Sequence, residues 1–202
     1  MFKDPVLQQL HTRVTQELGE IESVAPVSKE QYFQSLAENI VGQQLAIKAA
    51  DVITQRVRTV VGPEFTPKSV LAVPFDRLKG AGLSKAKTNY VRNIAEAWTN
   101  RLISVAKLDT LDDEALIIEL VKIKGVGRWT AEMFLIFTLG RADVFSIGDY
   151  GLRKAIVKAY GLDPLTKPTV LLELSNAWQP NRSLASRILW KSLELPLEES
   201  QS

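Results

Sequence analysis

The sequence contains no cysteine and only one histidine, and the two shortages exclude several kinds of site. Without cysteine the chain cannot form disulfides, thiolate zinc sites or thiolate-ligated iron–sulfur clusters. One histidine, His11, cannot build a histidine-rich metal site, and a lone histidine near the terminus does not favour a Ser-His-Asp triad. We therefore expect His11 to be an ordinary surface residue near the terminus.

Long apolar runs are also missing, as is a strong excess of charge. No stretch reaches about 18 uninterrupted apolar residues, and the first residues lack a signal-peptide pattern, so we expect a soluble, intracellular protein without a membrane partner. The net charge of +2 and a pI near 8.8 permit nucleic-acid binding without arguing for it. Any basic surface must therefore be local.

The apolar residues recur at helical spacing along nearly the whole chain. With 202 residues, 46% of them hydrophobic, the chain can bury the core of one large domain or two small lobes. Helix starts are predicted at Asp4-Pro5, Thr66-Pro67 and Ser84, and the acidic run Asp112–Glu114 is typical of another helix start. We predict a compact all-α fold of about ten short helices, with residues 198–202 as a frayed tail.

A glycine hairpin, Gly125-Val126-Gly127, stands between two predicted helices. Each glycine can adopt a positive φ and lets another chain approach the bare backbone, so that the amides can converge on an anion. The next helix begins there with its positive dipole end, and Lys122, Lys124 and Arg128 add positive charge. Phosphate binding and an ordinary turn that requires two glycines explain the pattern about equally well.

One acidic residue, Asp149, ends the loop that follows the hairpin's second helix. It follows Gly148, which allows a tight approach, and it can serve as a catalytic carboxylate or as the N-cap of a helix beginning at Tyr150. On its own the position favours the cap, although the two roles are compatible. Asp143 is the rival carboxylate, and we interpret it as structural because it directly follows a helix end.

Several ordered motifs together resemble the helix–hairpin–helix DNA glycosylase superfamily, and most closely its 3-methyladenine (alkylation-repair) branch. The resemblance extends from about Phe33 to Trp190. It is carried by these segments: 40–45 (IVGQQL), 82–90 (GLSKAKTNY), 120–131 (LVKIKGVGRWTA), 143–150 (DVFSIGDY) and 178–183 (WQPNRS).

The resemblance implies a single helix–hairpin–helix glycosylase domain over residues 1–202. The expected fold is all-helical and two-lobed, with the hairpin at about 120–130 and the active site in the cleft between lobes. Asp149 would face the anomeric carbon of a flipped nucleotide. The residues implied to line the base pocket are Trp129, Tyr150, Trp190 and Met133, the last standing where that branch has another aromatic residue.

The same match implies which residues contact DNA. Gln44 or its neighbour Leu45 would fill the gap that the flipped base leaves, although Leu45 is equally well explained as a core residue. The full DNA-binding set is Gln43, Gln44, Leu45, Lys122, Lys124, Gly125, Val126, Gly127 and Arg128.

The family's hairpin often holds a monovalent cation, Na⁺ or K⁺, on backbone carbonyls. The matching carbonyls here are those of Val121, Ile123 and Val126, and no cofactor is otherwise required. The implied partner is damaged double-stranded DNA, bound by a monomer. We expect a cytoplasmic, nucleoid-associated protein in a bacterium or a nuclear one in a eukaryote, without the extra N-terminal β domain of longer relatives.

The implied reaction is monofunctional hydrolysis of the N-glycosidic bond of alkylated bases, of the 3-methyladenine and 7-methylguanine class, leaving an abasic site. Strand-cutting branches use a lysine that forms a Schiff base, and Trp129 occupies that position here. A positively charged alkylated base also stacks favourably on indole. The alternatives are a non-catalytic helix–hairpin–helix DNA-binding module and a glycosylase for other damaged or mismatched bases.

Overall fold

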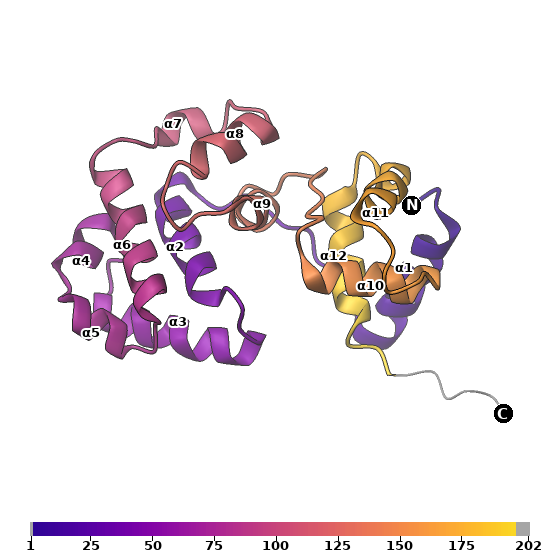
Figure 1. Cartoon of the computed structure of the whole chain (residues 1–202), viewed down its shortest axis with the longest axis horizontal. Helices are drawn as coiled ribbons and strands as arrows, with labels where there is room; N and C mark the ends of the chain where they lie inside the picture. The colour runs from indigo at the N-terminus through magenta and orange to yellow at the C-terminus, as the bar shows by residue number, and fades with distance from the viewer. Residues whose placement is uncertain (1, 197–202) are drawn as a thin grey trace. The chain divides into compact units, whose positions relative to one another are not determined.

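The structure is a computed structural model that describes residues 2–196, apart from the side chain of Ile47 (Figure 1). Over these residues the regular structure consists of twelve α-helices and two short 3₁₀ helices, with no strand. The all-α prediction is confirmed, with two helices more than the ten expected. The predicted frayed tail, residues 198–202, lies outside the described residues.

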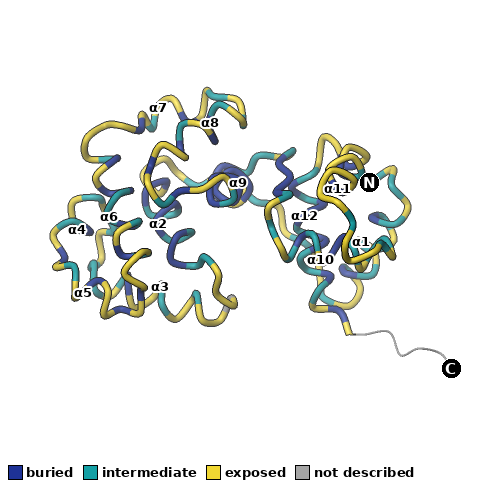
Figure 2. The backbone as a smooth tube through the Cα atoms, viewed as in Figure 1, coloured by how far each residue is buried: buried dark blue, intermediate teal, exposed yellow. Residues whose placement is uncertain are grey.

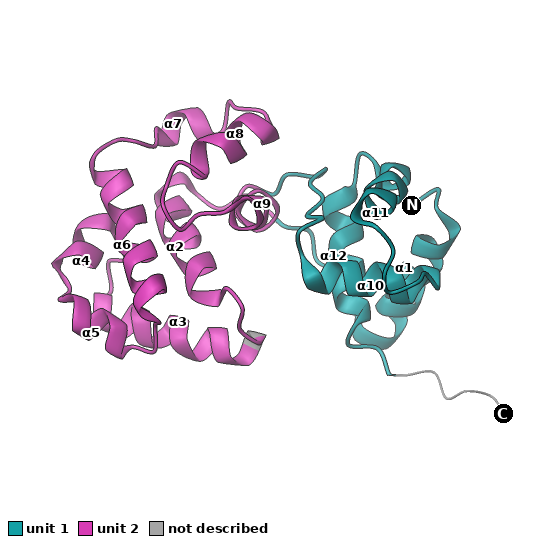
Figure 3. Ribbon diagram, in the orientation of Figure 1, with its two compact units in different colours: residues 1–24, 140–202 teal, residues 25–139 magenta. Residues whose placement is uncertain are grey.

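Residues 25–139 form one compact unit, coloured magenta in Figure 3. Within it α6 packs against α2, α4 and α5, while α9 packs against α2 and α8. The helices of this unit are η1 (Lys29–Gln31), α2 (Tyr32–Gly42), α3 (Ile47–Val61), α4 (Pro67–Ala72), α5 (Phe75–Gly80), α6 (Lys85–Thr99), α7 (Val105–Leu108), α8 (Asp113–Leu120) and α9 (Arg128–Phe137).

Side-chain caps begin several of these helices where the sequence predicts them. Ser84 Oγ accepts the amide of Lys87 at 3.2 Å, and Asp112 Oδ1 accepts that of Ala115 at 2.8 Å. Thr66 caps α4 in the same way. Each cap satisfies an amide that has no partner within the helix. The acidic run at residues 112–114 is therefore a helix start, as predicted.

Helix α9 is buried almost all round, and Figure 2 shows it as a dark blue coil. Every residue from 130 to 136 is buried, including the charged Glu132 at 4% exposure. A helix without an exposed polar face is typical of a protein core, so the apolar run after the hairpin forms a buried helix.

The second compact unit combines both ends of the chain, residues 1–24 and 140–202. Its helices are α1 (Pro5–Leu18), α10 (Tyr150–Tyr160), α11 (Pro168–Ser175), η2 (Asn176–Trp178) and α12 (Arg182–Ser192). Helix α1 packs against α12 and α10, and the core gathers Leu7, Val14, Leu152, Trp178 and Leu189.

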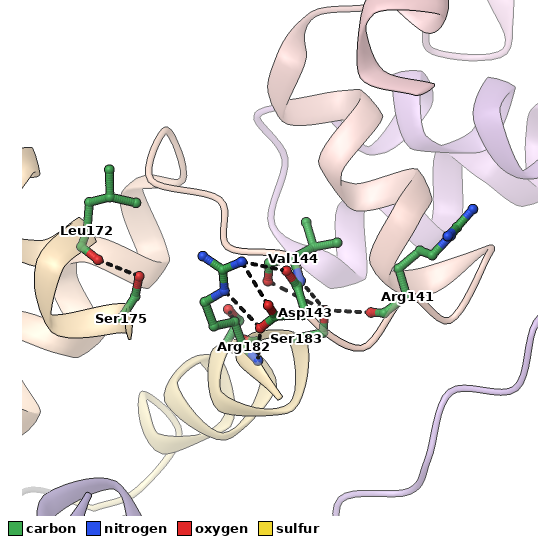
Figure 4. Close-up of polar contacts among 8 residues, drawn as sticks. Arg141, Asp143, Val144, Leu172, Ser175, Arg182 and Ser183 are labelled. Atoms are coloured by element: carbon green, nitrogen blue, oxygen red, sulfur yellow. Dashed lines mark hydrogen bonds and ion pairs between the residues drawn. The ribbon is translucent and has the colours of Figure 1, made fainter. Parts of the chain in front are cut away.

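A dense set of polar contacts fixes the loop that precedes α10 to the start of α12 (Figure 4). Arg182 Nε and Nη2 donate to Asp143 Oδ1 and Oδ2 at 2.8 and 2.9 Å. Ser183 Oγ donates to the carbonyl of Arg141 and accepts the amide of Val144. Asp143 is therefore occupied by a two-pronged ion pair, which agrees with its interpretation as a structural residue.

Candidate functional site

The hairpin occupies the turn between α8 and α9 and is held from one side by α6. Gly125 has φ +107°, and a Cβ there would lie 2.2 Å from Cγ of Tyr90. Asn93 Nδ2 donates to the carbonyl of Lys124 at 2.8 Å. Gly125 is thus required both for its backbone conformation and for the close approach of the Tyr90 ring.

Gly127 differs from Gly125 in its backbone conformation. Its φ is −91°, a value open to any residue, so of the two glycines only Gly125 uses the positive φ that both can adopt. Gly127 is the N-cap of α9, and a Cβ built there meets no heavy atom within 4 Å. The start of α9 is consequently open on this side, where its unpaired amides can face an anion.

The three basic residues around the hairpin are not equivalent. Lys122 Nζ lies 2.5 Å from Glu119, and the Arg128 guanidinium donates to both carboxylate oxygens of Glu114 at 2.8 and 2.6 Å. Arg128 Nε also donates to Glu132 at 3.0 Å. For the Lys124 ammonium no acidic partner is recorded within residues 2–196, so this side chain offers the most available positive charge.

The ion pair between Arg128 and Glu114 shifts both pKa values. The hydrogen bond from Arg128 lowers the pKa of Glu114, and the same bond raises the pKa of Arg128. Because Glu132 is buried, Arg128 also neutralises a carboxylate that would otherwise be costly to hold in the core. Arg128 therefore joins α8 to α9 in addition to its predicted place beside phosphate.

The carbonyls predicted to hold a cation accept few hydrogen bonds. Ile123 O accepts one bond, from the amide of Val126 at 2.9 Å, which leaves a lone pair. Among the described residues no donor is recorded for the carbonyls of Val121 and Val126. Backbone oxygens without donors suit a hard cation, so the residues present fit such a group. No cluster of three His, Asp or Glu side chains that could hold a metal occurs in residues 2–196.

The loop after α2 carries the residues predicted to enter the DNA stack. Gln44 has φ +56°, a left-handed conformation that costs a non-glycine residue about 1–2 kcal/mol. Gln44 is exposed, and Leu45 keeps 37% of its surface exposed, which disfavours a purely core role for Leu45. Strain of this kind, at an exposed tip, is typical of functional loops.

Gln43, by contrast, points inward. Its Nε2 donates to Thr130 Oγ1 at 2.7 Å, which ties the loop to the first turn of α9. Trp129 precedes Thr130 and is half-buried, whereas Met133 is buried at 7% exposure. This unit therefore brings together the loop after α2, the hairpin and two of the predicted pocket residues.

Lys87 lies in the segment 82–90, and the sequence alone predicts no role for it. In the structure Lys87 Nζ donates to the carbonyls of Val41 and Gln43 at 2.8 and 2.5 Å, at the end of α2. Partial burial lowers the pKa of this ammonium. The available signal was a lysine placed in the first turn of a helix, where the helix dipole disfavours positive charge.

Asp149 lies in the other unit, at the start of α10. Its Oδ1 accepts the amide of Leu152 at 2.6 Å and the indole N–H of Trp190 at 2.9 Å. The cap role is confirmed, and Trp190 is a hydrogen-bond donor to this carboxylate as well as a predicted pocket residue. Gly151 leaves room for the pair, since a Cβ there would lie 3.3 Å from Asp149 Oδ1.

Tyr150, the third predicted site residue of this unit, is 74% exposed. The unit thus places an anchored carboxylate, an indole and an open phenol ring on consecutive or contacting positions of α10 and α12. Both recorded bonds to the carboxylate fall on Oδ1, so the group is fixed in orientation by two donors.

Comparisons with known proteins find similarity over most of the chain. A family model described as "HhH-GPD superfamily base excision DNA repair protein" matches residues 37–180. DNA-3-methyladenine glycosylase 1 of Schizosaccharomyces pombe is 31% identical over 186 residues, which cover 91% of this chain and 82% of that relative.

Two solved structures are also similar over nearly the whole chain. One is the 3-methyladenine DNA glycosylase Mag1 of the same yeast in complex with abasic DNA, with a TM-score of 0.83, 29% identity and coverage of 95% of this chain and 98% of that one. The other is a DNA-3-methyladenine glycosidase from Bacillus halodurans, with a TM-score of 0.74, 34% identity and coverage of 95% and 90%.

Proposed function

This chain belongs to the HhH-GPD superfamily of base excision DNA repair proteins, and we propose on that premise that it excises alkylated bases from duplex DNA. The substrates are bases of the 3-methyladenine and 7-methylguanine class, released by hydrolysis of the N-glycosidic bond. The observation that carries the proposal is the anchored carboxylate of Asp149, held by two donors at the start of α10.

The chemistry requires a fixed negative charge. Loss of a base passes through an oxocarbenium-like sugar, and a carboxylate held near the anomeric carbon stabilises the positive charge that develops there. Because the Leu152 amide and the Trp190 indole already orient Asp149, no reorganisation is needed when that charge forms. The nucleotide must first rotate out of the stack, at a cost of a few kcal/mol.

The substrate class follows from the relatives' names and from the indole of Trp129. Alkylated purines carry positive charge, and stacking a cation on indole contributes about 0.5–2 kcal/mol. Such bases are good leaving groups that need little general-acid assistance. In the binding step, the amides at Gly127 and the ammonium of Lys124 hold DNA phosphate. A monovalent cation would be held by the carbonyls of Val121, Ile123 and Val126 and would supply further positive charge there.

We also propose that the enzyme lacks lyase activity and leaves an abasic site. Strand cleavage by this superfamily's bifunctional branches requires an amine at the position that Trp129 occupies, and indole cannot form a Schiff base. Borohydride added during the reaction should therefore trap no covalent protein–DNA adduct. A trapped adduct on 7-methylguanine DNA would refute this assignment.

The direct test is base release from methylated duplex DNA by the wild type and by Asp149→Asn. Asparagine keeps the cap but removes the charge, so we expect the rate of 3-methyladenine release to fall by at least about 100-fold. Asp112→Asn makes the same change at the cap of α8 and should leave the rate unaltered.

The outcomes also separate the alternatives. Equal release by wild type and Asp149→Asn would sink the assigned mechanism. Binding of duplex DNA without release of any base would favour a non-catalytic module, and release of only oxidised or mismatched bases would favour another glycosylase class. We also propose that the protein acts as a monomer, and sedimentation with and without DNA tests this. Its proposed place of action is the cytoplasm of a bacterium or the nucleus of a eukaryote.

A further inference from the structure

We propose that Lys87 is a positioning residue, which holds the loop Gly42–Leu45 in the conformation that enters the DNA stack during base flipping. The inference rests on the proposed function, because it concerns a step of that reaction. Lys87 is assigned no contact with DNA or with the reacting sugar. Its role is to fix the loop before DNA arrives.

The local sequence does not explain a lysine at this position. Lys87 is the third residue of α6, and its amide is bound by the N-cap Ser84. The first turn of α6 contains no acidic residue and also carries Lys85. Positive charge at a helix N-terminus opposes the helix dipole, so both lysines are unfavourable for α6 taken alone. A residue that breaks a local rule in this way is expected to serve another element.

That other element is α2, whose C-terminal end has the opposite charge preference. The last carbonyls of a helix lack partners within it, and a cation placed there satisfies them and the dipole together. Lys87 Nζ reaches the carbonyls of Val41 and Gln43 at 2.8 and 2.5 Å. The favourable interaction of the ammonium with the C-terminal end of α2 therefore offsets its unfavourable interaction with the dipole of α6.

The turn that Lys87 holds has few other supports. Its backbone bonds are long: Gln43 N to Ile40 O and Leu45 N to Gly42 O are both 3.3 Å. Gln44 lies in the left-handed region with φ +56°. A cavity of about 240 Å³ lies beside the loop, with Leu45, Ile53, Leu83 and Lys87 among the residues that line it. Because the loop is incompletely packed, its main anchors are the hydrogen bonds from Lys87 and the hydrogen bond between Gln43 and Thr130.

The consequence is specific to one step. A loop fixed in advance avoids the entropy cost of ordering when it enters the duplex. Loss of Lys87 should therefore slow opening of a paired lesion. It should barely affect a lesion whose base is already unpaired, because little work of opening remains.

The experiment compares two duplexes under single-turnover conditions. In one, a 7-methylguanine pairs with cytosine; in the other, the same lesion stands opposite an abasic site. For Lys87→Met we expect excision from the paired duplex to slow about 10-fold or more. Excision opposite the abasic site should change less than about 3-fold. Lys87→Arg keeps donors for both carbonyls and should restore most of the paired-duplex rate.

Lys85→Met is the matched control, because it removes the same charge from the same helix turn, at an exposed position. It should leave both rates within about 2-fold of the wild type. An equal loss on both duplexes, or no loss on either, would overturn the positioning role of Lys87. If Lys87→Met instead weakens binding to undamaged DNA with unchanged loop dynamics, Lys87 is a phosphate contact and the proposal is wrong.

A readout without substrate separates this proposal from the proposed function. Hydrogen exchange of the amides in residues 43–45 of the protein without DNA should quicken in Lys87→Met, while exchange within α9 stays unchanged. If the wild type excises no base but this exchange difference appears, Lys87 does hold the loop and the glycosylase assignment fails. If the exchange of the loop is unaltered, this role of Lys87 is itself refuted.

Discussion

The two glycines of the hairpin have different tasks, although they are chemically identical and two positions apart. At Gly125 a Cβ would collide with the Tyr90 side chain at 2.2 to 2.6 Å, and φ is +107°. At Gly127 a Cβ would meet nothing within 4 Å, and φ is −91°. The first glycine serves the fold, and the second keeps the start of α9 accessible.

Substituting these glycines should separate stability from DNA binding. We expect Gly125→Ala to lower the free energy of unfolding by about 2–4 kcal/mol, from backbone strain and overpacking. Gly127→Ala should cost less than about 1 kcal/mol. It should nevertheless weaken binding to undamaged duplex DNA, because the methyl group blocks close approach to the α9 amides. Urea unfolding and fluorescence anisotropy measure the two effects, and equal losses of stability would contradict the distinction.

Trp190 supplies a second prediction at the residue scale. Trp190→Phe keeps an aromatic ring but removes the donor to Asp149 Oδ1. A hydrogen bond to a charged group is worth about 1.5–3 kcal/mol, so we expect kcat to fall about 10-fold or more with KM nearly unchanged. If KM rises while kcat stays constant, Trp190 contributes only stacking of the base.

At the scale of elements, Arg128 connects α8 and α9 through Glu114 and Glu132. The partners are 14 and 4 residues away along the chain. The pKa of Glu114 is lowered below its ordinary value of 4.5 by its hydrogen bond from Arg128. A carboxyl whose pKa is lowered on folding stabilises the fold above its unfolded pKa, and this contribution disappears as pH falls through the folded value.

The pH dependence of the stability of Glu114→Gln tests the ion pair between Arg128 and Glu114. The variant should be slightly less stable than the wild type at neutral pH, since the pair is exposed and such pairs contribute little. The difference should shrink as the pH falls below 4.5, the ordinary pKa, and should vanish below the lowered pKa that Glu114 has in the folded protein. Chemical denaturation of both proteins across that range measures it, and a difference that persists in acid would show that charge pairing is not its source.

At the scale of the whole molecule, the N-terminal helix closes the unit that carries Asp149. Leu7 and Val14 of α1 are fully buried where α1 packs against α10 and α12, in the core that also contains Leu152. Residues from both ends of the chain therefore stabilise one element of the proposed active site.

Leu7→Ala should destabilise this unit by about 2–5 kcal/mol through the cavity it leaves. The rate of base release at low temperature should stay near the wild-type value, while the temperature of inactivation falls. Thermal unfolding followed with activity measures both. A variant of unchanged stability would contradict the burial of Leu7, and Leu165→Ala, at a position 89% exposed, is the matched control.

No helix within residues 2–196 is long and apolar enough to cross a membrane.

The net charge of the chain is only +2, so binding to DNA must depend on a few local cations. Lys124→Met should weaken binding to all duplexes alike and reduce the slope of log affinity against log salt by about 1. Lys122→Met should do less, because Glu119 already pairs with Lys122.

The sequence alone determined the helical class, most helix starts and the identity of the hairpin. These depend on signals within a few residues, such as Ser84, Asp112 and Asp149 acting as caps. It also distinguished Asp143 from Asp149, since one follows a helix end and the other precedes a helix start. The role of a residue that acts on its neighbours along the chain can be predicted from the sequence.

Only the tertiary structure decided the contacts that span many residues. It showed that Tyr90 requires Gly125, that Trp190 donates to Asp149, and that Lys87 holds the end of α2. It also showed that Gly127, unlike Gly125, has a φ open to any residue. The physical reason is that hydrogen bonds and steric contacts depend on distance in space, and residues 41 or 46 positions apart become neighbours only after the helices pack.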